Sequence, residues 1–292
     1  MIRRPAPLAL ALLACFVVWP AGCAPALPEI PTRESRRAVL SSAESFVTVL
    51  SAKADGETLR RSEVAILDAG HYSVDEIAAL REDGVLSLGY VNIGEVEDWR
   101  PFADRVDPAW ELGENPLWAG HRFVDAREAG WQDLVVGTVA RAVVAKEFDG
   151  LFLDMADVAA VFPETTDGVV ALIRALRETY PTHVLVMNRG LVVLDRVADD
   201  VDGLLVEGVF ARYDLAAERY EPTPPTARDR LVGALRAYRD STGGAAFVID
   251  YADTPEGRAA AEAAAAAHDL PIFVSTVELA DVPPPPDDRV AW

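Results

Sequence analysis

The sequence has little cysteine, little histidine and little positive charge. Its two cysteines, Cys15 and Cys23, both lie near the N-terminus, so the body of the chain offers no disulfide and no thiolate chemistry. Its four histidines show no pair spaced as on a zinc-binding helix. Arg and Lys number 27 against 47 Asp and Glu, which gives a net charge of −20. A chain this acidic is a poor partner for nucleic acid or anionic lipid headgroups, and we expect no nucleic-acid partner.

Several catalytic signatures are also absent. No G-x-G-x-x-G or Walker loop follows an apolar run, which disfavours a nucleotide-binding open sheet. There is no H-E-x-x-H motif, no cysteine cluster and no G-x-S-x-G elbow, so zinc-protease and serine-hydrolase chemistry are unsupported. An Asp/Glu site for Ca²⁺ or Mg²⁺ stays open but has no loop signature. We therefore predict no metal or other cofactor.

No apolar run is long enough to cross a membrane. The longest, residues 8–18, follows Arg3 and Arg4 and precedes Ala21-Gly22-Cys23. This order resembles a bacterial lipoprotein signal, which is cut before a cysteine that then carries the lipid. We predict an exported protein, anchored through Cys23 or secreted if that signal is not used. The predicted regions are a signal peptide (1–22), a Pro-rich tether (23–40), one domain (41–280) and a Pro-rich tail (281–292).

What the chain does contain is an alternation of short apolar runs with amphipathic stretches. Such alternation predicts a parallel sheet, and eight runs predict a single-domain (β/α)8 barrel of the TIM type. A doubly wound open sheet is the alternative. The predicted strands are 46–50, 64–67, 85–93, 151–153, 184–187, 203–206, 245–249 and 271–274. The clearest predicted helices are 74–82, 131–147, 167–179, 227–242 and 254–268. Residues 121–126 could form another strand, and we place them in the loop after the third.

Polar residues close most of the predicted strands. Asp154 ends the buried run of FDGLFLDMAD, and Glu207 ends the strand two further along the chain. The C-terminal ends of parallel strands meet at one mouth of a barrel, where such folds place their chemistry. Helix capping accounts for some Asp and Asn residues at these positions, but Glu is not a favoured cap. Other polar residues at these ends include Asp68, Tyr90, Glu95, Asn188, Asp250 and Tyr251, and the eighth strand ends in Ser275-Thr276.

Two carboxylates on different strands are the minimum for glycoside hydrolysis. One attacks or activates water, and the other protonates the leaving oxygen. Aromatic residues near the mouth could stack on sugar faces. They are Tyr90, Trp99, Trp118, Trp131, Phe210 and Tyr251. Two alternatives remain: a barrel that binds saccharide without turnover, and a divalent-metal hydrolase that uses Asp68, Glu95, Asp154 and Asp250.

Six segments together resemble glycoside hydrolase family 114, a group related to endo-α-1,4-polygalactosaminidase. They are VAILDAG, YVNIGEVEDWR, FDGLFLDMAD, MNRG, DGLLVEG and VIDYAD, and the resemblance runs from about Phe46 to the end of the eighth strand. It implies a (β/α)8 barrel with Asp154 and Glu207 as the catalytic pair. By analogy with retaining α-galactosidases, it implies Asp154 as nucleophile and Glu207 as acid/base. The substrate contacts that it implies are Asp68, Tyr90, Glu95, Asn188, Asp250 and Tyr251.

The resemblance also implies a substrate class, the α-linked galactosamine polymers, which are cationic when deacetylated. Signal cleavage would remove Arg3 and Arg4 and change the net charge from −20 to −22, which would attract such a chain. Arg189 directly follows Asn188 and could hold a carboxylate or an acetamido group, and FVTVLS departs from the Gln-rich first strand common in the family. We thus predict an exported, monomeric glycosidase that degrades an amino-sugar polysaccharide. The alternative is a non-catalytic saccharide-binding lipoprotein on the same barrel.

Overall fold

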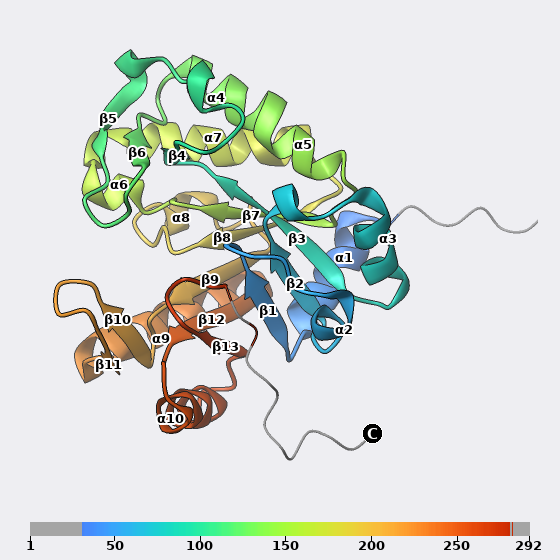
Figure 1. Ribbon diagram of the computed structural model, residues 1–292, viewed down its shortest axis with the longest axis vertical. Coiled ribbons are helices and arrows are strands. Elements are labelled where there is room, and N and C mark those ends of the chain that lie inside the picture. The colour runs from blue at the N-terminus through green and yellow to red at the C-terminus, as the bar shows by residue number, and fades with distance from the viewer. Residues whose placement is uncertain (1–30, 281, 283–292) are drawn as a thin grey trace, which may run out of the picture. The chain divides into compact units, whose positions relative to one another are not determined.

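The computed structural model describes residues 31–280 and residue 282, which belong to one compact unit (Figure 1). The predicted signal peptide, the predicted lipidation site Cys23 and nearly all of the predicted tail lie outside the described residues. Within the described part of the chain, no helix is long and apolar enough to cross a membrane.

The predicted (β/α)8 barrel is confirmed. Eight parallel strands pair in chain order, with each strand hydrogen-bonded to the next, and helices fall between them (Figure 1). The sheet is nearly closed, because the rings of Phe46 on the first strand and Phe273 on the last lie 6.1 Å apart. The barrel strands are β1 Phe46–Val49, β2 Val64–Leu67, β3 Leu86–Asn92, β7 Gly150–Asp154, β8 Val184–Asn188, β9 Gly203–Glu207, β12 Ala245–Tyr251 and β13 Ile272–Ser275.

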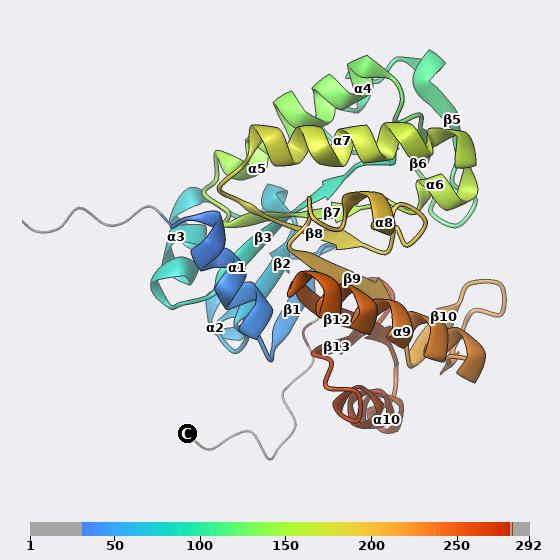
Figure 2. The same cartoon turned by 180° about the vertical axis from the view of Figure 1, so that it is seen from behind.

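The helices cover the outside of the sheet, and α9, for example, packs on β9 and β12 (Figure 2). The predicted helix over 131–147 is observed as three contiguous helical segments. The middle one, η4, is a π-helix. The helices are α1 Arg33–Ser42, α2 Gly56–Leu59, α3 Val74–Glu82, α4 Ala129–Leu134, η4 Val135–Ala140, α5 Arg141–Val144, α6 Val158–Val161, α7 Thr166–Thr179, α8 Leu194–Val197, α9 Pro225–Thr242 and α10 Pro255–Ala266. The short 3₁₀ helices are η1 Ala69–His71, η2 Ala103–Arg105, η3 Pro108–Trp110 and η5 Pro163–Thr165.

Two insertions follow the C-terminal ends of barrel strands. After β3 comes an antiparallel sheet of β4 Glu95–Glu97, β5 Glu111–Glu114 and β6 His121–Val124, in the order β4-β6-β5. Residues 121–126, which we predicted to lie in the loop after the third strand, therefore contain strand β6. After β9 comes the hairpin of β10 Ala211–Asp214 and β11 Arg219–Pro222. Both insertions stand at the mouth of the barrel and extend its walls.

The predicted tether over 23–40 needs a correction at its C-terminal end. Residues 33–42 form helix α1, which is capped by Thr32 and buries Leu40. Arg36 on this helix bonds the carboxylate of Asp149, which precedes β7. The helix therefore closes the end of the barrel at which the strands begin, opposite the mouth. Periodicity alone did not reveal this, because only a few of its residues are apolar and its arginines find their partners far along the chain.

Candidate active site

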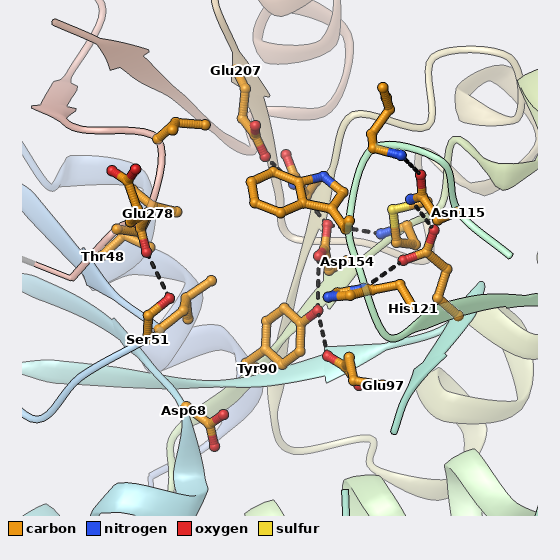
Figure 3. Close-up of a pocket in the computed structure, with 18 of the residues that line it drawn as sticks. Thr48, Ser51, Asp68, Tyr90, Glu97, Asn115, His121, Asp154, Glu207 and Glu278 are labelled. Atoms are coloured by element: carbon orange, nitrogen blue, oxygen red, sulfur yellow. Dashed lines mark hydrogen bonds and ion pairs between the residues drawn. The ribbon is translucent and has the colours of Figure 1, made fainter. Parts of the chain in front are cut away.

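The mouth of the barrel opens into a cleft of about 1000 Å³. The residues at the ends of β7, β8 and β9 lie on its floor, and the β4–β6 sheet forms one wall. Figure 3 shows His121 and Asn115 on one side of Asp154, and Thr48, Ser51 and Glu278 on the other. The predicted site residues that line this cleft are Asp68, Tyr90, Glu95, Asp154, Asn188, Glu207 and Tyr251.

Asn188 joins the two predicted catalytic carboxylates. Its Nδ2 donates to Asp154 Oδ1 at 2.9 Å and to Glu207 Oε1 at 2.5 Å. Two oxygens bound to one nitrogen at these distances are at most about 5.4 Å apart. The amide oxygen of Asn188 is buried without a hydrogen-bond partner in the described structure, which costs about 1–3 kcal/mol. The two carboxylate acceptors on the amide nitrogen fix this orientation and offset that cost.

The residue that follows each of Asp154, Asn188 and Glu207 has a left-handed backbone conformation. Met155 after Asp154, Arg189 after Asn188 and Gly208 after Glu207 have φ of 62°, 55° and 67°, in the left-handed region. Met155 and Arg189 carry side chains, and this conformation costs such residues on the order of 1–3 kcal/mol each. Strain of this size is typical of sites where the surrounding structure fixes the direction of a side chain. Here each turn ends a barrel strand directly after a side chain that lies in the cleft.

The electrostatics of Asp154 differ from those of a surface carboxylate. Burial, followed by the negative charge of Glu207, raises the pKa of Asp154 to about 7, against opposing hydrogen bonds from Asn188 and the Met155 amide. Glu207 also accepts a 2.6 Å hydrogen bond from the hydroxyl of Tyr251. Arg189 Nη2 lies 4.0 Å from the same oxygen, Oε2. The pair therefore has two carboxylates in different surroundings, as a division of roles between them requires.

The hydroxyl of Tyr90 lies between two carboxylates. It is 3.0 Å from Asp154 Oδ2 and 3.1 Å from Glu97 Oε1, and it accepts a bond from Asn92 Nδ2. One hydroxyl proton cannot serve both carboxylates, so the arrangement is fully satisfied when Asp154 carries a proton on Oδ2. Arg100 donates to both oxygens of Glu97, at 3.1 and 3.2 Å. The geometry therefore agrees with the raised pKa of Asp154.

Arg100 ties this network to a second barrel strand. Its Nη1 bonds Asp68 Oδ2 at 2.6 Å, and its guanidinium lies over the ring of Tyr90 at 5.2 Å. Burial opposes its charge, but Glu97 and Asp68 raise its pKa above the usual value. Asp68 also accepts from the amide of Gly70. We predicted Asp68 as a substrate contact, and in the structure it holds Arg100 at the edge of the cleft.

Three residues that the sequence placed at the mouth lie away from the cleft. Asp250 is fully buried, and its two oxygens accept from the amides of residues 209–211. It therefore fixes the loop that follows Glu207 and has no free oxygen for substrate. Trp131 is buried and donates its indole N–H to the backbone of Ile93. Phe210 stacks on His268 with centroids 5.6 Å apart.

Sequence reasoning missed Glu97, Arg100, Asn115 and His121. The first two lie in the YVNIGEVEDWR segment. Its second glutamate, Glu97, was the feature that could have indicated a further site residue there. The other two lie in the β5–β6 region, and only the antiparallel pairing of β4 with β6 brings them to the cleft. Within the described residues, no group of three or more His, Cys, Asp and Glu is arranged to hold a metal ion. Of the four carboxylates considered for a metal site, Asp68 pairs with Arg100 and Asp250 lies outside the cleft.

Comparisons with known proteins show a family and a shared fold. The sequence model of glycoside-hydrolase family GH114 matches residues 29–289. An uncharacterized protein of Thermotoga maritima is 27% identical over 220 aligned positions, and the match covers 65% of this chain and 65% of that protein. The chain spans less than two thirds of the length of the curated relatives it matches.

Solved structures share the barrel. The glycoside hydrolase domain of PelA from Pseudomonas aeruginosa is similar with a TM-score of 0.74 and 25% identity, over 82% of this chain and 98% of that chain. Ega3 from Aspergillus fumigatus, solved in complex with galactosamine, has a TM-score of 0.68 over 81% of this chain and 92% of that chain. At 14% identity this second likeness shows the fold alone.

Proposed function

The chain belongs to glycoside-hydrolase family GH114, and from this premise we propose that it cleaves an α-linked galactosamine-type polysaccharide with retention of configuration. Asp154 would attack the anomeric carbon to form a covalent glycosyl-enzyme, while Glu207 donates a proton to the departing oxygen. Glu207 would then take a proton from water as the water releases the sugar. This assignment of roles follows the analogy with retaining α-galactosidases, which place the nucleophile on the fourth strand and the acid/base on the sixth.

One observation carries the mechanism: the shared hydrogen-bond donor Asn188. It limits the nearer oxygens of Asp154 and Glu207 to about 5.4 Å, whereas inverting enzymes keep their carboxyl groups about 6.5–9.5 Å apart to admit a water. Retaining enzymes keep them about 5–5.5 Å apart. The bridge therefore supports direct attack by a carboxylate.

The substrate class rests on charge and on likeness. Ega3, the fungal protein with the same fold, was solved with galactosamine. This chain has a net charge of −20, and acids that include Asp157 and Glu278 line its cleft. Such a field would raise the association rate of a cationic chain by about 10–1000-fold at low salt. A deacetylated galactosamine polymer is therefore the substrate that we propose.

The test is an incubation of the purified protein with α-1,4-linked galactosamine oligosaccharides and with their N-acetylated counterparts. Reducing ends report cleavage, and NMR of the fresh product reports its anomeric configuration. We expect cleavage of the deacetylated chain and an α-configured product. Tight binding without any product would favour the non-catalytic alternative, and a β-configured first product would contradict retention.

The pH profile is a further expected result. As nucleophile, Asp154 must be ionised, and its raised pKa keeps it protonated up to about pH 7. Ionisation of Asp154 should therefore give kcat/KM an acid limb centred near pH 7, along which it falls about tenfold per pH unit as the pH drops, and loss of the proton that Glu207 donates should lower it again at higher pH. Initial rates on a short substrate between pH 4.5 and 8.5 measure this. An acid limb near pH 4 would contradict the assignment, provided that circular dichroism shows the protein folded throughout.

Export and anchoring are proposed from the N-terminal sequence. If the enzyme is cut before Cys23 and lipidated there, the full-length protein should sediment with membranes when expressed in a bacterial host. The Cys23→Ser variant should move to the soluble fraction while its folded domain keeps its specific activity. Equal membrane association of both forms would contradict lipidation at Cys23.

A further inference from the structure

Exposed aromatic residues stand on one wall of the cleft. Trp99, which follows β4, is 61% exposed, and Trp118, in the loop between β5 and β6, is 40% exposed. Both line the cleft. A tryptophan that serves packing is largely buried, so two exposed ones on a concave surface indicate contact with a ligand.

The loop that carries Trp118 is held in one shape. The amide of Asn115 donates to the carbonyl of His121 at 2.8 Å, and the amide of His121 donates to the carbonyl of Trp118 at 3.1 Å. Gly120 has a φ of 80°, and a side chain there would meet the ring of Trp99 at 3.2 Å. The indole of Trp99 therefore rests against the backbone of this loop. A ligand would meet a surface that is already formed.

His121 is fixed between the two indoles. Its ring lies edge-on to Trp99 at 5.2 Å and is 6.3 Å from Trp118. Its Nδ1 is 3.0 Å from Glu95 Oε2, and Glu95 Oε1 accepts from Asn115 at 2.6 Å. An ionised carboxylate can only accept, so the proton lies on Nδ1. The other nitrogen, Nε2, has no hydrogen-bond partner among the described residues and is available to a ligand.

The buried position of the Glu95 side chain is unfavourable for folding. It is 2% exposed, and its side-chain partners are an amide and a histidine, with no arginine or lysine. A buried carboxylate without a cationic partner costs folding energy. Orienting His121 explains the position of Glu95, which the sequence assigned to direct substrate contact. Its negative charge also favours a cation beside His121.

We propose that Trp99, Trp118 and His121 form a second sugar subsite, which binds a further amino-sugar ring of the chain that is cleaved at Asp154 and Glu207. The indoles would pack on the apolar faces of the ring, and Nε2 of His121 would accept a hydrogen bond from its ammonium group or a hydroxyl. The proposal rests on the proposed function and extends it from the bond that is cleaved to the neighbouring units of the polymer.

A series of contacts links this wall of the cleft to the reacting pair. His121 is paired with Glu97 across the β4–β6 ladder, Glu97 bonds Tyr90, and Tyr90 bonds Asp154. The side chains of Glu97 and Tyr90 thus connect this wall to the reacting pair. We expect a short substrate to occupy the site at Asp154 and Glu207, whereas a long chain can also reach the indoles. Affinity should therefore increase with chain length.

The experiment measures binding by titration calorimetry in a Glu207→Gln background, which prevents turnover. The probes are a disaccharide and a heptasaccharide of α-1,4-linked galactosamine, with an N-acetylated heptasaccharide for comparison. The double variant Trp99→Ala/Trp118→Ala should lose about tenfold or more in affinity for the heptasaccharide, and this loss should nearly vanish for the disaccharide. His121→Gln should weaken binding of the amine form more than that of the acetylated form.

Val161→Ala is the matched control, because Val161 is also apolar, exposed at 57% and part of the cleft lining. It should change affinity less than twofold, and thermal unfolding confirms that all variants are folded. Unchanged heptasaccharide affinity in the double variant overturns the subsite, even if the wild type cleaves the polymer. Length-dependent binding that requires the indoles, without cleavage by the wild type, sustains the subsite and overturns the proposed reaction. No binding of either oligosaccharide overturns both.

Discussion

Asp154→Asn and Glu207→Gln are each expected to reduce kcat/KM by at least about 1000-fold, because each removes a group that the reaction cannot replace. Both changes keep the size of the side chain and leave an oxygen to accept from Asn188. The fold should therefore survive, and the midpoint of thermal unfolding checks this. Near wild-type activity in either variant would overturn the assignment of the pair.

Glu278→Gln is the matched control for this prediction. Glu278 is an exposed carboxylate that lines the same cleft on the far side of Asp154 from His121 (Figure 3). Its replacement removes one negative charge from the cleft without touching the pair. We expect a change in kcat/KM of only a few fold, and mainly at low salt, where long-range attraction counts most.

Rescue by azide separates the roles of the two carboxylates. With Asp154→Ala, azide can replace the nucleophile and attack the substrate directly, so the glycosyl azide has the inverted, β configuration. With Glu207→Ala and an activated leaving group, azide attacks the glycosyl-enzyme, and the product is the α-azide. The opposite pattern would exchange the roles, and an inverted azide from both variants would exclude a covalent intermediate.

The second large effect concerns stability. Asp202, which precedes β9, is fully buried and bonds Arg33 at 2.9 Å, Arg177 at 2.6 Å and the amide of Leu185 at 3.0 Å. Asp202→Ala leaves these donors without their carboxylate and should lower the free energy of unfolding by about 3–5 kcal/mol. In a domain of this size, the melting midpoint should fall by roughly 10 °C. Denaturant or calorimetric unfolding measures the loss.

The control for this change is Asp167→Asn, which breaks an ion pair with Arg196 at the surface, where the Asp167 side chain is 86% exposed. It should barely move the midpoint, because exposed pairs contribute little. Below the melting temperature, Asp202→Ala should keep its kcat/KM, since Asp202 lies at the end of the barrel opposite the cleft. A stable Asp202→Ala protein would show that α1 does not depend on this carboxylate.

The barrel could be predicted from the sequence because the patterns that indicate its strands and helices are formed by neighbouring residues. Each predicted strand is a short buried run, and each matches an observed strand to within a few residues. The predicted helix over 74–82 coincides with α3, whose start is marked by the capping box of Ser73 and Glu76. The order of these elements leaves few topologies, because parallel strands with helical connections pair in a right-handed sense.

The polar strand ends were readable for the same reason. A parallel barrel carries every C-terminal strand end to one mouth, so the topology alone predicted that Asp154, Asn188 and Glu207 meet in one cleft. What the sequence could not give was the role of each polar end. Asp250 ends β12 like the others, yet the loop after β9 folds over it and takes both of its oxygens.

The sequence by itself thus determined the barrel, the family and the carboxylates at its mouth, since strand length, periodicity and strand order are properties of neighbouring residues. Only the tertiary structure decided that α1 closes the far end, that Arg100 holds Glu97 against Tyr90, and that Glu95 orients His121 between two indoles. Arg36 and Asp149, and likewise Glu95 and His121, lie on different elements. Their meeting depends on how α1 and the β4–β6 sheet pack against the barrel, and no local pattern encodes that packing.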